Sequence, residues 1–163
     1  MERADVVVVG AGAMGSATAR ALGERGVDTV LLEQFTVGHG RGSSHGATRI
    51  FRFAYQDSDY VRMAMRAERA WWDLEAASGE TLLVRTGGVD AGPGAQACAD
   101  AMAACDAEHE WLSRAAASAA YPDIDFEGYD RVLRHPAAGV CLAARAVAAQ
   151  VRLARMAGVS VRE

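Results

Sequence analysis

The chain has 163 residues with 21 acidic side chains and 17 arginines, no lysine, and a formal net charge of -4 at pH 7. That length suffices for one ordinary domain with its own core. The acidic balance and the absence of any basic run argue against nucleic acid as a partner. Because the sequence has no lysine, these residues cannot supply a Schiff-base lysine.

The N-terminus carries an apolar β-branched run, DVVVV, at residues 5–9. Such a run predicts a strand that is buried on both faces. Both charge signs precede the run and a glycine loop follows it, so it matches neither a signal peptide nor a membrane span. We therefore expect a cytoplasmic protein without a membrane partner.

The next segments complete a strand, helix and strand pattern. Residues 13–24 are rich in alanine and predict a helix, and Gly26 stands where a left-handed C-cap is favoured. Residues 29–32, TVLL, predict a second strand, and Glu33 follows it directly. This order predicts one βαβ unit.

A glycine fingerprint, GAGAMG, joins the first strand to the helix. Gly10 permits a tight turn, Gly12 lets the backbone approach a pyrophosphate, and Gly15 allows close packing of helix on strand. The phosphates would lie at the helix N-terminus. Glu33 stands where an acid accepts hydrogen bonds from an adenosine ribose. The pattern predicts a dinucleotide site, without separating FAD from NAD.

Periodicity and breakers predict the remaining elements. In the first of these elements, a helix at 58–77, Trp71 and Trp72 are interpreted as core anchors and Met63 as one of the inward residues. In chain order we expect a helix at 58–77, a strand-like stretch at 82–91 broken by glycines, a helix at about 95–113, an irregular segment at 113–139, a helix at 143–157 with Val147, Val151 and Ala154 inward and Gly158 at its end, and a final strand from 159.

The three cysteines, Cys98, Cys105 and Cys141, fit neither an even disulfide framework nor a CxxC metal pair. On one helix, Cys98 and Cys105 would lie roughly 10 Å apart, which is beyond disulfide reach. We interpret the cysteines as small buried side chains. His109 recurs on the same predicted helical face and is interpreted as a core or rim histidine, and we predict no metal site.

The stretch RGSSHGATRIFRFAY at residues 41–55 gathers glycines, serines, a histidine and arginines just after the nucleotide-binding pattern. Together with DVVVVGAGAMGSA, YVRMAMRAERAWWDLE and TGGVDAGP, it resembles the N-terminal part of the monomeric sarcosine oxidase family, whose relatives include N-methyltryptophan and pipecolate oxidases. These are FAD-dependent amine oxidoreductases. The likeness extends over essentially the whole chain but over only about two fifths of such an enzyme.

The resemblance implies an α/β fold: a Rossmann-type FAD-binding domain with the start of an inserted α+β substrate domain, apparently incomplete. It implies an N-terminal FAD-binding segment at 1–80, a partial substrate domain at 81–138 and a return segment at 139–163. His45 and Arg49 would be catalytic residues beside the flavin, and Arg52 would bind a substrate carboxylate. The implied cofactor-binding residues are Gly10, Gly12, Met14, Gly15, Glu33, Gln34, Ser43, Ser44, His45 and Arg49.

The implied reaction oxidises a secondary amine or N-methyl amino acid to an imine while O2 is reduced to H2O2. Ser44 and Ala47 depart from many sarcosine oxidases, which have histidine and aspartate there. The family's flavin-anchoring cysteine and oxygen-activating lysine have no counterpart in these residues. Two alternatives remain open, an NAD-dependent dehydrogenase and a non-catalytic truncated fragment that binds a nucleotide, as does the oligomeric state.

Overall fold

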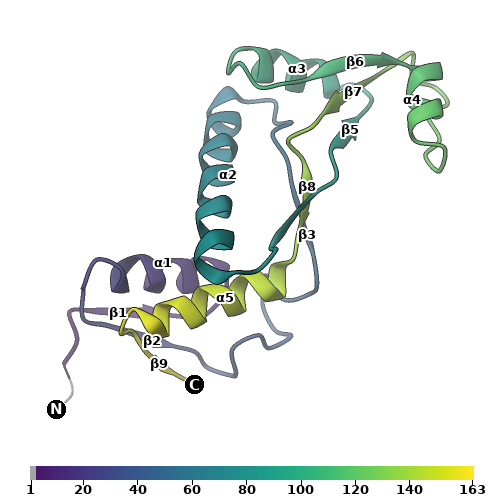
Figure 1. Ribbon diagram of the computed structural model, residues 1–163. Helices are drawn as coiled ribbons and strands as arrows, with labels where there is room; N and C mark the ends of the chain where they lie inside the picture. The colour runs from purple at the N-terminus through teal and green to yellow at the C-terminus, as the bar shows by residue number, and fades with distance from the viewer. Residues whose placement is uncertain (1–2) are drawn as a thin grey trace. The chain divides into compact units, whose positions relative to one another are not determined.

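The computed structural model describes residues 3–163, so the first two residues of the predicted N-terminal segment lie outside it. The chain divides into two compact units (Figure 1). Unit 1 comprises Met1–Arg49, Trp72–Leu82 and Cys141–Glu163, and unit 2 comprises Ile50–Trp71 and Leu83–Val140. Each unit is described by itself.

Unit 1 contains a parallel three-stranded sheet in the order β1-β2-β9. Val6 pairs with Thr29 at one boundary, and Val30 pairs with Ser160 at the other. The expected strand, glycine turn, helix and strand are thus confirmed. The elements are β1 (Val6–Val9), α1 (Ala13–Gly23), β2 (Thr29–Leu32), α5 (Ala143–Met156) and β9 (Ser160–Arg162).

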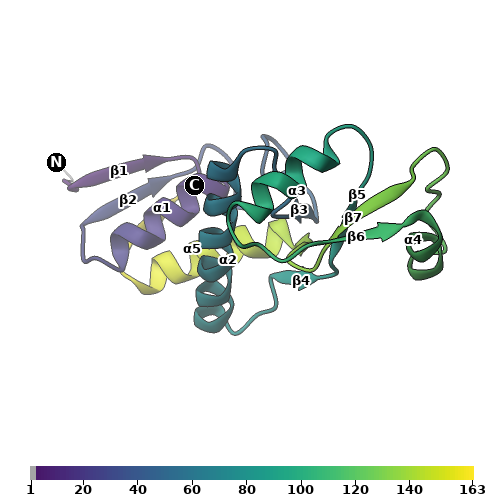
Figure 2. The same ribbon diagram turned by 90° about the horizontal axis from the view of Figure 1, so that it is seen from above.

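Helices α1 and α5 lie side by side in unit 1 (Figures 1 and 2). Their shared core includes Ala19, Leu31 and Val151, all of which are buried. Gly23 lets the end of α1 approach the segment that follows α5, because a Cβ there would lie 2.7 Å from Cγ2 of Val159. The predicted inward face of α5 is confirmed, and the helix ends before Gly158, which has φ +90°.

The prediction that the first strand is buried on both faces is wrong. Alternate residues of β1 are accessible, with Val7 55% and Val9 82% exposed. The reason is that the core of α1 and α5 covers one face of this sheet, and the side chains of a strand alternate between the two faces.

None of the helices in residues 3–163 has the length and apolar character that a bilayer span requires.

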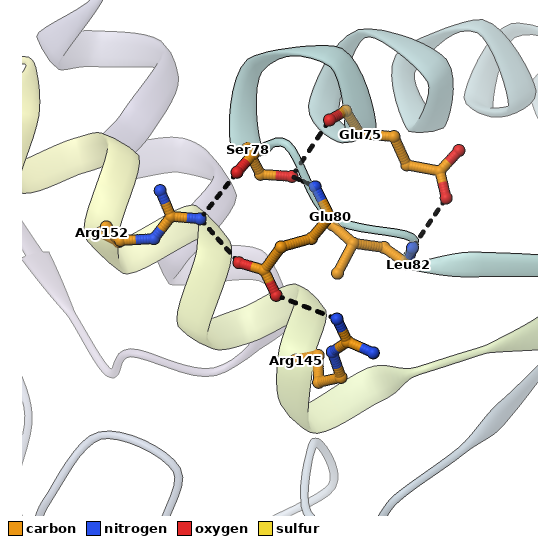
Figure 3. A network of polar contacts seen from close by, with 6 residues as sticks. All are labelled: Glu75, Ser78, Glu80, Leu82, Arg145 and Arg152. Carbon is orange, nitrogen blue, oxygen red and sulfur yellow. Dashed lines mark hydrogen bonds and ion pairs between the residues drawn. The ribbon is translucent and has the colours of Figure 1, made fainter.

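A polar network in unit 1 joins the turn after α2 (Ser58–Ser78) to α5 (Figure 3). Glu80 accepts hydrogen bonds from Arg152 at 2.6 Å and from Arg145 at 3.4 Å. Arg152 also donates to the carbonyl of Ser78 at 3.1 Å, and Glu75 accepts from the backbone of Leu82 at 2.7 Å. The hydrogen bond from Arg152, against an opposing desolvation effect, lowers the pKa of the Glu80 carboxyl.

Unit 2 contains an antiparallel sheet in the order β5-β7-β6, and most residues of a second sheet, in the order β3-β8-β4, also belong to it. Phe53, Val61, Met102 and Leu133 form part of its buried core. The strands and helices are β3 (Arg49–Phe51), β4 (Leu83–Arg85), β5 (Gly88–Asp90), α3 (Ala95–Ala103), β6 (Glu110–Ser113), α4 (Arg114–Ala120), β7 (Arg131–His135) and β8 (Gly139–Cys141).

The predicted helix at 95–113 is too long, because α3 ends at Ala103. The chain turns at Asp106, whose φ is +54°, and the amide of Ala107 donates to the carbonyl of Met102 at 3.0 Å. This is a Schellman-type ending with an aspartate at the left-handed position, where glycine is more usual. His109 therefore lies before β6 and not on a helical face, and one of its ring nitrogens lies 2.8 Å from the carbonyl of Ala107.

The segment expected to be irregular, 113–139, contains a helix that the sequence interpretation missed. Ser113 caps α4 by accepting a hydrogen bond from the amide of Ala116 at 3.2 Å. The length of α2 was predicted correctly, but its inward face only in part: Val61 and Leu74 are buried, whereas Met63 is 54% and Trp72 47% exposed.

All three cysteines are free, and Cys105 lies beyond the end of α3. Cys98 and Cys141 are buried as expected, whereas Cys105 is half-buried. Burial raises the pKa of both buried thiols. Residues 3–163 contain no cluster of three or more side chains suited to a metal ion.

Candidate functional site

Each glycine of the loop between β1 and α1 occupies a position that requires glycine for its own steric reason. Gly10 has φ +92°, which allows the turn, and its amide donates to the carbonyl of Leu32 at 2.7 Å. A Cβ on Gly15 would lie 1.8 Å from the carbonyl oxygen of Gly10. A Cβ on Gly12 would lie 3.0 Å from Oγ of Ser44. The loop therefore brings its backbone close to the first turn of α1.

Glu33 holds this loop through its carboxylate. Oε2 accepts a hydrogen bond from the amide of Ala11 at 2.7 Å, and Oε1 accepts one from the amide of Phe35 at 3.1 Å. The hydrogen bond from Ala11 is the main cause that lowers the pKa of this buried carboxyl, while burial itself opposes the shift. Glu33 is thus a fixed anion at the end of β2.

His39 contacts Glu33 through Nε2, which lies 3.2 Å from Oε1. Its Nδ1 accepts a hydrogen bond from the amide of Arg41 at 2.9 Å. An Nδ1 that accepts a backbone hydrogen bond carries no proton, so Nε2 is the ring nitrogen that donates to Glu33. The guanidinium of Arg41 lies 4.4 Å from the centre of the Phe35 ring, in the range of a cation–π contact.

Ser44 and Arg49 shape the loop that follows. The hydroxyl of Ser44 accepts a hydrogen bond from the amide of Ala13, the first residue of α1, at 3.0 Å. Arg49 donates to the carbonyls of Ser43 and His45 at 2.6 Å and of Thr48 at 2.7 Å. His45 is exposed, and its Nδ1 contacts the carbonyl of Gly42. Arg49 therefore fixes the loop with a single charged group.

These segments enclose a cavity in unit 1 with a volume of about 360 Å³. Seven of the predicted cofactor-binding residues line it, namely Gly10, Gly12, Glu33, Gln34, Ser43, Ser44 and His45. Met14 is 82% exposed on the first turn of α1, and Gly15 packs against Gly10. Arg49 does not line the cavity, and it contacts the loop through the carbonyls of Ser43 and His45.

Sequence reasoning missed several lining residues, and the signal for them was weak. Phe35, His39 and Arg41 contribute side chains, and α5 contributes Ala144 and Val147. The loop residues follow Glu33 within eight positions, so a polar, glycine-rich loop after the acid was the available signal. The residues of α5 come from more than 100 positions away, and local sequence gave no indication of them.

Arg52 lies in unit 2 and lines a different cavity, with a volume of about 440 Å³. Its Nη1 lies 3.8 Å from Oδ1 of Asp90, and its guanidinium lies 5.3 Å from the centre of the Tyr55 ring. Tyr60 and Cys98 also line this cavity. The cavity combines one cation, carboxylates and phenol rings, which suits a small polar molecule.

Comparison with known proteins identifies relatives over nearly the whole chain. Residues 5–163 match the family model described as FAD dependent oxidoreductase. Monomeric sarcosine oxidase from Bacillus sp. (strain NS-129) is 32% identical over 96% of this chain and 42% of its own length. A putative sarcosine oxidase from Caenorhabditis elegans is 37% identical over 85% of this chain and 37% of its own length. The chain thus spans about two fifths of these relatives.

Solved structures agree in fold. A variant of NikD, an unusual amino acid oxidase essential for nikkomycin biosynthesis, gives a TM-score of 0.83 at 29% identity over 99% of this chain and 43% of its own. L-Proline dehydrogenase from P. horikoshii gives a TM-score of 0.87 at 20% identity, over 99% of this chain and 44% of its own. The α/β fold expected from the sequence is confirmed.

Proposed function

The chain belongs to the FAD dependent oxidoreductase family, and on this premise we propose that unit 1 binds the adenosine diphosphate part of FAD. The observation that carries the proposal is the cavity at the N-terminus of α1, lined by Gly10, Gly12, Glu33 and Ser44. A glycine loop at a helix N-terminus suits a pyrophosphate, because free amides and the helix dipole favour negative charge. FAD, and not the NAD of the alternative hypothesis, is the cofactor of this family.

Glu33 fits the ribose end of this proposal. Its Oε1 already receives the amide of Phe35 and Nε2 of His39, whereas Oε2 accepts only from Ala11 among the contacts described above, so Oε2 keeps a lone pair for a ribose hydroxyl. Its negative charge would repel a 2'-phosphate. The lowered pKa of Glu33 keeps that charge in place at neutral pH.

The roles proposed for His45 and Arg49 concern the flavin ring. Arg49 is a permanent cation held by three backbone carbonyls, so its charge has a fixed position on the loop. A fixed cation stabilises negative charge that develops on a reduced flavin. His45 lies on the same loop, within the lining of the cavity.

We propose that the whole protein acts on a secondary amine or N-methyl amino acid and that Arg52 binds the substrate carboxylate through its planar fork. When bound, FAD supplies the acceptor for a hydride from the carbon beside the amine nitrogen, which yields an imine, and O2 takes up the two electrons with two protons to form H2O2. The contribution of the residues of this chain is to bind and orient the cofactor and the substrate.

The domain roles are part of the same proposal. Segments 1–80 and 139–163 are assigned to FAD binding and 81–138 to the substrate domain. Unit 2 additionally includes Ile50–Trp71, whose Val61 and Ala64 pack in the same core as Met102. The cytoplasmic location stays a prediction.

The first experiment titrates the purified chain with FAD and, separately, with NAD, and follows flavin absorbance and fluorescence. We expect saturable FAD binding that Gly12→Val abolishes, because the added side chain would occupy the approach to Ser44 and the phosphates. Gly40→Val is the matched control, since a Cβ there meets no atom within 4 Å. NAD binding without FAD binding would refute the proposal.

A second experiment addresses Arg52. In a catalytically active form of the protein, Arg52→Gln should weaken binding of amines that carry a carboxylate and leave FAD content unchanged. An equal loss for amines without a carboxylate would contradict the role proposed for Arg52.

A further inference from the structure

Unit 2 contains a buried histidine that the proposed function does not use. His135 is 1% exposed, and its Nε2 lies 2.9 Å from Oδ2 of Asp90. In the antiparallel pair of β5 and β7, His135 lies opposite Gly88. A Cβ on Gly88 would lie 2.9 Å from Cε1 of His135, so the missing side chain of this glycine lets the imidazole reach across to Asp90.

The hydrogen-bonding pattern defines which ring nitrogen donates. Within residues 3–163, the buried Nδ1 of His135 has no hydrogen-bond partner. A buried N–H without an acceptor is more costly than a bare ring nitrogen, so the proton belongs on Nε2. His135 therefore donates to Oδ2 of Asp90 and holds this oxygen at a distance of 2.9 Å.

The other oxygen of Asp90 faces Arg52. Oδ1 lies 3.8 Å from Nη1 of Arg52, which is close enough for attraction but too long for a hydrogen bond. A free aspartate beside an arginine commonly forms two parallel hydrogen bonds with the guanidinium. Here that closed pair is not formed, and the Arg52 side chain remains 45% exposed at the cavity.

We propose that His135 is a positioning residue for Arg52. By holding one oxygen of Asp90, it prevents that carboxylate from closing on the guanidinium, so the fork of Arg52 stays available to the carboxylate of a small substrate. The guanidinium lies 5.3 Å from the centre of the Tyr55 ring. This inference rests on the proposed function of Arg52 as the carboxylate-binding residue.

The first test needs no ligand. NMR spectra of the 15N-labelled chain report the arginine side chains, and the Arg52 signal is identified by its loss in Arg52→Gln. His135→Leu should shift the Arg52 signal and slow rotation of its guanidinium, because Asp90 closes on it. His135→Gln, which keeps an amide donor near the position of Nε2, should retain the wild-type signal, and so should the double variant His135→Leu with Asp90→Asn.

The second test measures binding of N-methylglycine, with dimethylamine as the comparison that lacks a carboxylate, through the same Arg52 signal. His135→Leu should weaken N-methylglycine binding about tenfold, the scale of one charge-assisted hydrogen bond that must be exchanged. Asp90→Asn should bind as well as wild type or better, and the double variant should regain wild-type affinity. Glu110→Gln is the control, because it removes an exposed ion pair with Arg134 in the same sheet.

The outcomes distinguish the role of His135 from the role of Arg52. An unchanged Arg52 signal in His135→Leu, or a double variant as weak as His135→Leu, overturns the positioning role. If wild type shows no carboxylate-dependent shift, the role of Arg52 fails, while the ligand-free spectra still decide the role of His135. Should circular dichroism show that His135→Leu is unfolded, His135→Asn takes its place, since its shorter amide cannot reach Asp90, and the same criteria apply.

Discussion

The cavities of the two units are made of different chemical groups. In unit 1, glycines and backbone amides at the N-terminus of α1 provide the surface of the cavity. Glu33 fixes the glycine loop by accepting a hydrogen bond from the amide of Ala11, and it also accepts one from the amide of Phe35. In unit 2, the surface depends on charged side chains, chiefly Arg52 and Asp90, whose arrangement depends on His135. The backbone determines the shape of the cavity in unit 1, whereas the pairing of side chains determines the shape of the cavity in unit 2.

This difference determines how each cavity fails. A change at a backbone-built site disturbs the fold of its unit, because the same atoms form both the site and the packing. A change at a side-chain pair can redirect one charge and leave the fold in place. The following substitutions sharpen or break this contrast.

Gly15→Ala should have the largest effect. The added Cβ would lie 1.8 Å from the carbonyl oxygen of Gly10, so backbone must move and α1 must separate from β1. We expect a loss of about 4 kcal/mol or more in the stability of unit 1, measured by urea unfolding and by hydrogen exchange of β1 and β2 amides. Gly40→Ala should stay within about 0.5 kcal/mol of wild type. Equal midpoints for the two variants would contradict the packing role of Gly15.

Glu33→Gln should have the next largest effect and should change the pH dependence. The loss of charge-assisted hydrogen bonds from Ala11 and Phe35 should cost about 1.5 to 3 kcal/mol at neutral pH. The folded-state pKa of Glu33 is lowered, so its stabilisation is complete above the ordinary value of 4.5 and is lost as the pH falls through the folded pKa.

Unfolding curves recorded from pH 7 down through the acid range check this prediction. Wild type should lose stability more steeply than Glu33→Gln below about pH 4.5, where the unfolded carboxyl takes up its proton. Parallel curves for the two proteins would show that Glu33 is not the anion that holds the glycine loop.

Gly88→Ala should have a moderate effect confined to unit 2. Its Cβ would lie 2.9 Å from both Cε1 of His135 and Cβ of Ala138, so we expect a loss of about 1 to 3 kcal/mol from overpacking. Gly94→Ala is the matched control, because its Cβ meets only the end of the flexible Gln56 side chain, at 2.6 Å. If Gly94→Ala is the more damaging change in thermal unfolding, the position of His135 over Gly88 is wrong.

Glu80→Gln should have the smallest effect. This carboxylate lies near the surface, where ion pairs with Arg145 and Arg152 contribute little and are screened by salt. The melting temperature should fall less than for Glu33→Gln at low salt, and the difference from wild type should disappear near about 1 M NaCl. A salt-independent loss would mean that Glu80 acts through packing.

Sequence alone predicted the parts of the fold that depend on local pattern. The glycine fingerprint, β1, α1, β2 and α5 each have their signal within about a dozen residues. The end of α3 was missed because Asp106 takes a left-handed conformation that glycine usually marks. Contacts such as that of Asp90 with His135 join residues 45 positions apart and depend on strand register, which no local pattern specifies.

The pairing of β2 with β9 has a consequence for the order of folding. Val30 pairs with Ser160, so the sheet of unit 1 closes a loop of 130 residues, and α1 obtains its packing partner only when α5 arrives. Closing so long a loop costs chain entropy before any stabilising contact forms, and this cost slows folding. During synthesis, the glycine loop therefore lacks the packing of α5 and the pairing of β9 until nearly all of these residues have left the ribosome. Unit 2, whose segments are closer in sequence, is expected to fold first.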